Sequence, residues 1–147
     1  MALDFVWHPW RVLRIRYPDV EVSCRHRLPD HLMGLQHGDR IWLCRTLTQA
    51  ERRCTLTHEL VHRERGPVPA DPVAAAAEER AVDEIAARRL ISIGSLLDGL
   101  AWTRDPHQLA EHLWVDVPTL HTRMATLDPL EVAELENRLD GEWLWIP

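Results

Sequence analysis

Polar and hydrophobic residues alternate in the first third of the chain, a pattern that is typical of half-buried strands. The turn signals Pro18-Asp19 and Gly38-Asp39 interrupt this alternation. The pattern predicts strands at residues 12–17, 20–24 and 41–44, with a short further strand at residues 33–35. We therefore expect a small, mostly antiparallel sheet.

The hydrophobic spacing changes to a helical period after Thr48. Thr48 with Glu51 three residues later is a capping-box pattern for a helix start, and Gly66-Pro67 would end that helix. Pro72 is placed to begin a long second helix that stops near Gly94. Three shorter helices are predicted at residues 106–114, 118–127 and 129–139. Together the elements predict an α+β fold.

The first long helix contains the motif His58-Glu59-Leu60-Val61-His62. Two histidines four residues apart lie on one face of a helix and can bind a single zinc ion. Glu59 lies about 100° further round the helix, where its carboxylate reaches the open side of the metal and can take a proton from an activated water molecule. The alternative is a chance pattern with two surface histidines.

A catalytic zinc ion needs a third protein ligand, and the second long helix can supply one. Glu79 shares a helical stripe with apolar residues and faces inward, whereas the stripe of Glu78 leads to Arg89. Periodicity therefore favours Glu79 modestly. Cys54 is excluded as a ligand together with His62, because eight residues of helix span about 12 Å. Glu78 and Glu84 are expected to be solvated.

The paired motifs resemble those of the ImmA/IrrE-type zinc metallopeptidases, small proteins of bacteria, phages and mobile elements. That family has an HExxH helix followed by a second helix reading Glu-x-x-Ala-Asn-x-Phe-Ala-x-x-Leu-Leu. Residues 79–91 here read Glu-Arg-Ala-Val-Asp-Glu-Ile-Ala-Ala-Arg-Arg-Leu-Ile, and the similarity covers most of residues 20–95. Val82 and Asp83 replace the usual Ala-Asn, and Ile85 replaces Phe.

The resemblance implies a zincin-like metallopeptidase domain over residues 1–95, with a helical, helix-turn-helix-like region over residues 96–147 packed on it. It implies a zinc ion held by His58, His62 and Glu79, with Glu59 as the general base. The implied substrate is a bacterial or phage regulatory protein, such as a repressor or an antitoxin. The alternative is a non-catalytic regulator that uses the same zinc-stabilised fold to bind a repressor without cutting it.

Charge and composition narrow the class of partner. The net charge is −6, and residues 67–147 contain 6 Arg against 15 acids. The second helix of the helix-turn-helix-like region offers only His121 and Arg123 to DNA, so phosphate repulsion makes direct DNA binding unlikely and favours a structural or partner-docking role. Three cysteines without CxxC spacing, no secretory signal and no membrane span predict a cytoplasmic protein.

Seven tryptophans are many for 147 residues. Trp42 and Trp114 fall where core residues are expected. Trp7 and Trp10 near the start, with Trp143 and Trp145 in the tail, are expected to pack on the domain as apolar lids. An aromatic surface for a protein partner is the alternative.

Overall fold

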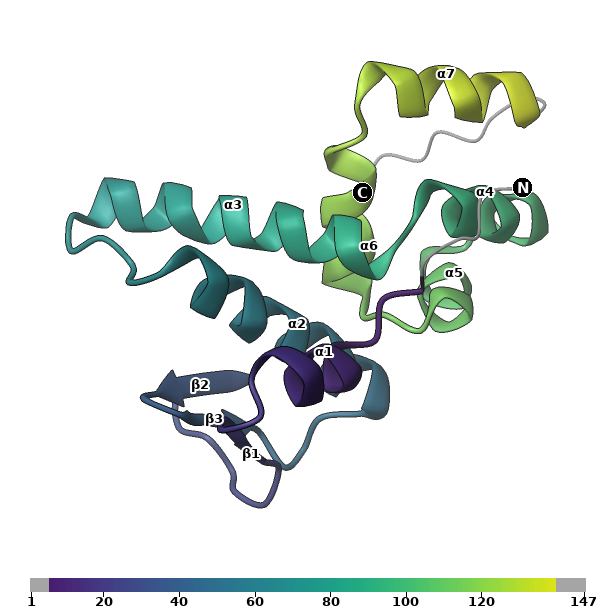
Figure 1. The fold of residues 1–147 in the computed structure, drawn as a ribbon. Helices are drawn as coiled ribbons and strands as arrows, with labels where there is room; N and C mark the ends of the chain where they lie inside the picture. The colour runs from purple at the N-terminus through teal and green to yellow at the C-terminus, as the bar shows by residue number, and fades with distance from the viewer. Residues whose placement is uncertain (1–5, 140–147) are drawn as a thin grey trace.

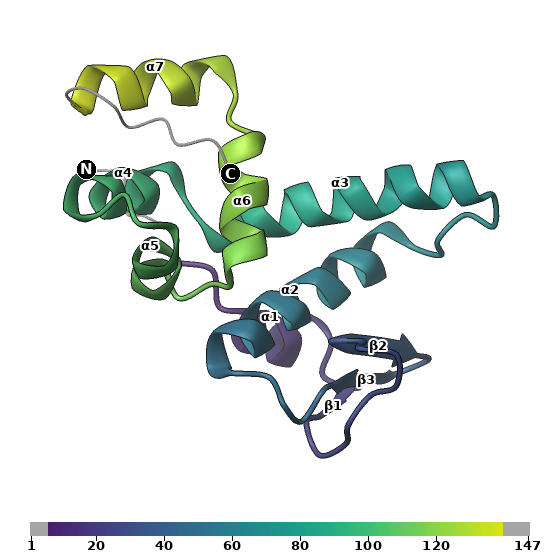
Figure 2. The same ribbon diagram turned by 180° about the vertical axis from the view of Figure 1, so that it is seen from behind.

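The computed structural model describes residues 6–139, which form an α+β fold (Figure 1). In the views of Figures 1 and 2, helix α2 lies between the small sheet and the long helix α3, and the last four helices gather around the C-terminal end of α3. In chain order the elements of this described part are α1 (Pro9–Arg16), β1 (Glu21–Ser23), β2 (Gly34–His37), β3 (Arg40–Leu43), α2 (Gln49–Arg65), α3 (Pro72–Leu90), α4 (Ile93–Trp102), α5 (Pro106–Leu113), α6 (Val117–Ala125) and α7 (Pro129–Arg138).

The sheet is mixed, with the strand order β1-β3-β2. Strand β1 runs parallel to β3, with Glu21 opposite Arg40, whereas β2 runs antiparallel to β3, with Gly34 opposite Leu43. The prediction of a mostly antiparallel sheet is therefore wrong. Its cause is the loss of the first predicted strand, since β1 has no hairpin partner before it and pairs with β3 instead.

Helix α1 occupies the segment that was predicted to be that first strand. Pro9 stands at the first helical position, where its missing N–H costs nothing. Pro9, Val12 and Leu13 are spaced as a helical stripe and pack inward, whereas Ile15 is 71% exposed. The apolar residues of this segment thus also fit a helical period, and the helix is the structure that buries Val12 and Leu13.

The predicted ends of the two long helices are mostly confirmed. Thr48 accepts a hydrogen bond from the backbone N–H of Glu51, and the Glu51 carboxylate accepts one from the backbone N–H of Thr48, which completes the capping box of α2. Gly66 ends α2 with a φ of 96°, a conformation that favours glycine. Pro72 begins α3, and the side chain of Asp71 caps it.

Helix α4 was not predicted, because Gly94 was interpreted as the end of the preceding helix. Helix α3 ends at Leu90, and Ser92 then caps a new helix by accepting from the backbone N–H of Ser95. The predicted domain boundary between residues 95 and 96 falls inside α4. The three predicted C-terminal helices are confirmed as α5, α6 and α7, with ends that differ by one or two residues.

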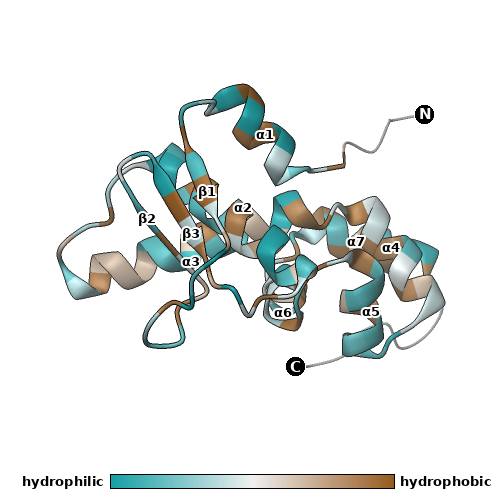
Figure 3. Cartoon of the chain, turned by 90° about the horizontal axis from the view of Figure 1, so that it is seen from below, coloured by the Kyte–Doolittle hydropathy of each residue, from teal (hydrophilic) through white to brown (hydrophobic). Residues whose placement is uncertain are grey.

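Buried apolar side chains form three clusters, and Figure 3 shows the hydrophobic segments that supply them interleaved with polar ones. One cluster joins the sheet to α2, and a second joins α2 to α3. The third lies among α4–α7 and extends to Trp7, Cys54 and Leu90. The helical C-terminal region therefore shares a core with the elements before it. Among the described helices, none is both long and apolar enough to cross a lipid bilayer.

The tryptophans divide between core and surface. Trp7 is 8% exposed and donates a hydrogen bond from its indole N–H to Thr57 Oγ1 at 2.9 Å, so it packs as expected. The same prediction is wrong for Trp10, which is 44% exposed on α1. Trp42 is only partly buried. The prediction that Trp114 is a core residue is wrong, because Trp114 ends α5 in the left-handed conformation and is 54% exposed. Trp143 and Trp145 lie outside the described residues.

Candidate metal centre

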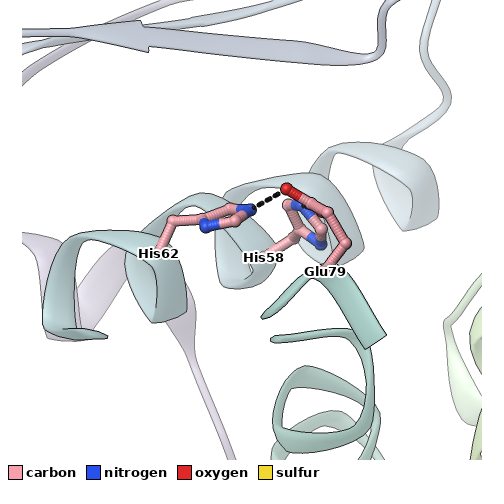
Figure 4. A group of neighbouring side chains, drawn as sticks. All are labelled: His58, His62 and Glu79. Carbon is pink, nitrogen blue, oxygen red and sulfur yellow. Dashed lines mark ion pairs between the residues drawn. The ribbon is translucent and has the colours of Figure 1, made fainter. Parts of the chain in front are cut away.

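Three side chains predicted as zinc ligands converge between α2 and α3 (Figure 4). His58 and His62 project from consecutive turns of α2 toward the carboxylate of Glu79, which α3 supplies. His62 Nε2 lies 2.9 Å from Glu79 Oε1, and His58 Nε2 lies 3.4 Å from Glu79 Oε2. The ligand atoms of all three residues lie within 4.8 Å of one another.

The two helices are held at this spacing by an apolar contact directly behind the polar cluster. Val61 of α2 packs against Val82 and Ala86 of α3, and all three side chains are buried. Val61 lies next to His62 in sequence, and Val82 lies one helical turn after Glu79. The same pair of facing stripes that forms the core between the helices therefore sets the positions of the ligand side chains.

The donor set and its spacing fit a zinc ion. Imidazole nitrogens and a carboxylate oxygen are common zinc ligands, and bonds of about 2.0–2.1 Å place the donors of a tetrahedral site about 3.3 Å apart. The nitrogen–oxygen distances of 2.9 and 3.4 Å are close to that edge length. A set of three protein ligands leaves a fourth position for water or substrate, which is the arrangement of catalytic zinc sites.

Asp83 adds a contact behind His58. Its Oδ1 lies 3.0 Å from His58 Nδ1, on the opposite side of the imidazole from the nitrogen that faces Glu79. A carboxylate at this position accepts the Nδ1 proton and leaves the Nε2 lone pair for a metal. Burial lowers the pKa of His58, but the hydrogen bond to Asp83 and the negative charges of the nearby carboxylates outweigh it, so the net pKa is raised.

Glu59 lies beside the ligand cluster and is held by a strand. Its side chain is buried at 8% exposure. The side-chain amide of Gln36 in β2 donates to Glu59 Oε2 at 2.8 Å and to the backbone oxygen of Glu59 at the same distance. One amide group thus fixes both the side chain and the main chain of Glu59.

Gly34 allows β2 to approach α2 this closely. A Cβ atom at Gly34 would lie 2.6 Å from Thr55 Cγ2 and 2.9 Å from Glu59 Oε1, which are both too short for a real contact. Gly34 and Gln36 are two residues apart in the strand, so they face the same side, toward α2. The position of Glu59 therefore depends on the sheet as much as on its own helix.

Sequence reasoning missed three contributors to this centre. Gln36 and Gly34 contact Glu59 across more than 20 residues of chain, and nothing local in the sequence indicates that contact. Asp83 was considered but given no role. Its position four residues after Glu79, on the same face of a helix, is the signal that could have identified it.

The acids next to the cluster pair with arginines. The prediction that Glu79 faces inward while Glu78 is solvated is wrong, because the Glu78 side chain is 19% exposed beside Arg65 and that of Glu79 is 48% exposed at the edge of the two helices. Glu78 pairs with Arg65 rather than with the histidines, and Glu84 pairs with Arg88. Cys54 is buried and lies outside the ligand set, and burial raises its pKa to about 11. The structure therefore brings together His58, His62 and Glu79, with Glu59 adjacent to them.

No protein-family model, curated protein or solved structure matches this chain. The resemblance to the ImmA/IrrE-type peptidases consequently rests on the two motifs themselves. What the geometry adds is that both motifs meet at one place, although 16 residues of chain separate His62 from Glu79.

Proposed function

We propose that the chain has a zincin-like core and is a zinc-dependent endopeptidase that cuts a bacterial or phage regulatory protein, such as a repressor or an antitoxin. One observation supports this proposal most strongly. Two imidazoles and a carboxylate from two helices converge at metal-binding distances, and a buried carboxylate, Glu59, lies beside them. The regulatory substrate is inferred from the family resemblance alone.

His58, His62 and Glu79 would hold the zinc ion, and Asp83 would orient the imidazole of His58. When bound, the ion would supply a Lewis acid that polarises a peptide carbonyl and makes a water molecule more acidic. Glu59 takes a proton from the attacking water molecule and returns it to the leaving amine. Gln36 keeps Glu59 Oε2 fixed, which leaves Oε1 for this transfer.

The edge of the sheet offers a route for the substrate. Among residues 6–139, strand β2 pairs with β3 alone and lies at the edge of the sheet, and both Gly34 and Gln36 of β2 lie beside Glu59. An extended peptide can add to an open strand edge through main-chain hydrogen bonds. We therefore propose that the scissile segment is extended and lies along β2.

The charge and burial of the C-terminal helices favour a protein, rather than DNA, as the partner of this region. Arg123, one of the two basic candidates of the second helix in this region, is 2% exposed and pairs with Glu131, so it cannot reach a phosphate group. The acidic balance of residues 67–147 also opposes a polyanion. We propose that this region buttresses the metal centre and contacts a protein substrate.

The rival function is a regulator that binds a repressor without cutting it. A scaffold of that kind does not require a carboxylate at position 59, nor an amide that holds it. The buried, hydrogen-bonded Glu59 therefore favours the peptidase.

The two functions are separated by Glu59→Gln, which keeps the shape of the side chain and removes its basicity. Wild type and Glu59→Gln are expressed at equal levels in a bacterial host, and newly formed protein N-termini are identified by mass spectrometry. We expect a set of new N-termini with wild type that falls by roughly 100-fold or more with the variant. Glu64→Gln is the matched control, because Glu64 lies on the same helix and pairs with Arg89 at the surface.

Equal sets of new N-termini from wild type and Glu59→Gln would contradict the peptidase. If, in addition, Glu59→Gln relieved repression by a target repressor to the same extent as wild type, the non-catalytic regulator would replace the peptidase as the proposed function. Zinc content is measured on both proteins, since loss of the metal would otherwise imitate loss of the base.

A further inference from the structure

A cleft of about 420 Å³ opens beside the candidate metal centre, between α2, α3 and the start of α6. His58 and Glu59 form part of its floor, so it is continuous with the atoms proposed to react. Its walls are mostly hydrocarbon and come from the segment before β2, from α3 and from α6: Leu32, Met33, Ala86, Leu90, Pro118 and Thr122.

We propose that this cleft is a specificity subsite that binds one bulky apolar side chain of the substrate next to the scissile bond. The proposal rests on the proposed peptidase function and names the kind of residue that the enzyme selects. It also gives the C-terminal region a role, because α6 forms one wall of the subsite.

The carboxylates around the cleft are already used within the fold. Glu51 accepts from the backbone N–H of Thr48 at 2.9 Å, and Asp116 accepts from the backbone N–H of Thr119 at 2.9 Å. Asp83 lies 3.0 Å from His58 Nδ1. These partners hold the three carboxylates against the protein, and the walls between them are apolar. A cationic side chain is the competing occupant, because the carboxylates keep their charge, and the probes below distinguish the two.

The side chains that open onto the cleft include apolar groups with exposed surface. Leu32 and Met33 are both exposed, although each is large and hydrophobic. They lie immediately before β2, the strand along which the substrate is proposed to run. An apolar substrate side chain in the cleft would cover them, which is favourable because it removes hydrocarbon surface from water.

The α6 wall is fixed in place before any ligand binds. The backbone N–H of Asp116, at the start of α6, lies 3.4 Å from Cys54 Sγ of α2. At the other end of α6, Arg88 of α3 donates to the backbone oxygen of Thr126 at 2.7 Å. A preformed wall binds a side chain without the entropic cost of ordering a loop.

A second cleft, of about 760 Å³, adjoins the same centre and shares Leu32, Gly34, His58 and Glu59 with the first. It contains His37, Arg63 and Glu79 and is therefore more polar in its chemistry. The proposed reacting groups thus border two unlike clefts. The smaller, apolar cleft is the one that selects a bulky hydrophobic residue.

The experiment measures the binding of small hydroxamates, which are zinc-directed probes, to the zinc-loaded full-length protein by calorimetry. Acetohydroxamate provides the zinc-binding group without a side chain. Analogues with an isobutyl, a benzyl or an aminobutyl group add an apolar or a cationic side chain. We expect the isobutyl or benzyl analogue to bind roughly 10- to 100-fold more tightly than acetohydroxamate, because its side chain is buried.

Thr122→Trp fills the cleft from α6 and should remove this gain while leaving the affinity for acetohydroxamate unchanged. Ala125→Trp is the matched control, since Ala125 is an exposed residue at the end of the same helix. The comparison of probes on wild type does not depend on either variant folding.

Equal affinities for all four probes would overturn the subsite, and tightest binding of the aminobutyl analogue would replace it with a cationic one. In both cases acetohydroxamate still binds and the proposed metal centre stands. Failure of acetohydroxamate to bind the zinc-loaded protein would overturn the proposed function and the subsite with it.

Discussion

The side-chain amide of Gln36 lies 2.8 Å from Glu59 Oε2 and donates a hydrogen bond to it. The two residues come from different elements, since Gln36 is in the edge strand β2 and Glu59 is in the helix that supplies the histidines. The proposed general base is therefore positioned by a residue outside the HExxH motif. This contact makes the edge strand part of the proposed catalytic arrangement.

Replacing Gln36 with methionine keeps the approximate size of the side chain and removes both hydrogen bonds to Glu59. We expect kcat on a peptide cut by the wild type to fall by roughly 10- to 100-fold, because small displacements of a catalytic group cost that much. KM and zinc content should change little. The free energy of unfolding should fall by roughly 2–3 kcal/mol, because two hydrogen bonds are lost and one of them is to a buried carboxylate.

Leu35→Met is the control for Gln36→Met, because Leu35 is the neighbouring strand residue and faces away from α2. Kinetic measurements on both variants give the comparison. An unchanged kcat in Gln36→Met, or an equal loss in Leu35→Met, would show that Gln36 does not position the base.

Asp83 is predicted to tune the metal site through His58. Asp83→Ala removes the acceptor 3.0 Å from His58 Nδ1 and should weaken zinc binding by roughly 10- to 100-fold, which is typical for the loss of such a partner. Asp83→Asn keeps an acceptor and should have a smaller effect. Glu84→Ala, one residue further along α3, is the control. Competition with a chromophoric chelator measures the affinities, and equal affinities for all variants would contradict this role.

The ion pair between Arg123 and Glu131 is predicted to stabilise the C-terminal helices. Arg123 is buried, donates from Nε to the backbone oxygen of Ile91 at 2.8 Å, and pairs with Glu131 of α7. Glu131→Gln should lower the free energy of unfolding by on the order of 3 kcal/mol, because it removes the negative charge that faces buried Arg123 and that also lies 2.9 Å from Arg88. Glu134→Gln removes an exposed pair with Arg138 and should cost less than about 1 kcal/mol.

The same pair predicts how this stabilisation depends on pH. Burial raises the pKa of Glu131, but its hydrogen bonds to Arg123, to the backbone of Asp128 and to Arg88 outweigh that effect and lower the pKa to about 2. A lowered folded-state pKa stabilises the protein above the unfolded-state pKa of about 4.3. The difference between wild type and Glu131→Gln in urea unfolding should therefore shrink between about pH 4.3 and pH 2. A constant difference over that range would contradict the assignment.

Local signals in the sequence were sufficient for the helices that position the ligands. The capping box at Thr48 and Glu51 fixed the start of α2, and the helical period placed His58 and His62 on one face. The stripe that Glu79 shares with buried residues of α3 favoured the residue that does lie near both imidazoles, although its side chain is 48% exposed rather than facing inward. These features depend on neighbours within a few residues of sequence, so they can be predicted without knowledge of the tertiary structure.

The features that were missed depend on contacts between distant segments. The contact of Gln36 with Glu59 and the cleft wall made by α6 exist only after the sheet and the C-terminal helices pack on α2. Helix α1 was mistaken for a strand because a six-residue window fits both periods, and only the burial of Val12 and Leu13 decides between them. The zinc ligation, the peptidase function and the substrate stay predictions.

The account depends on a zinc ion held by His58, His62 and Glu79, and metal content tests this most directly. Wild type, His62→Ala, Glu79→Ala and Glu78→Ala are dialysed against dilute zinc at neutral pH, and bound zinc is measured by elemental analysis. Glu78 is the matched control, because it neighbours Glu79 but pairs with Arg65. We predict about one zinc ion per chain in wild type and Glu78→Ala, and far less in His62→Ala and Glu79→Ala. Equal zinc content in all four proteins, or none in wild type, would contradict the account.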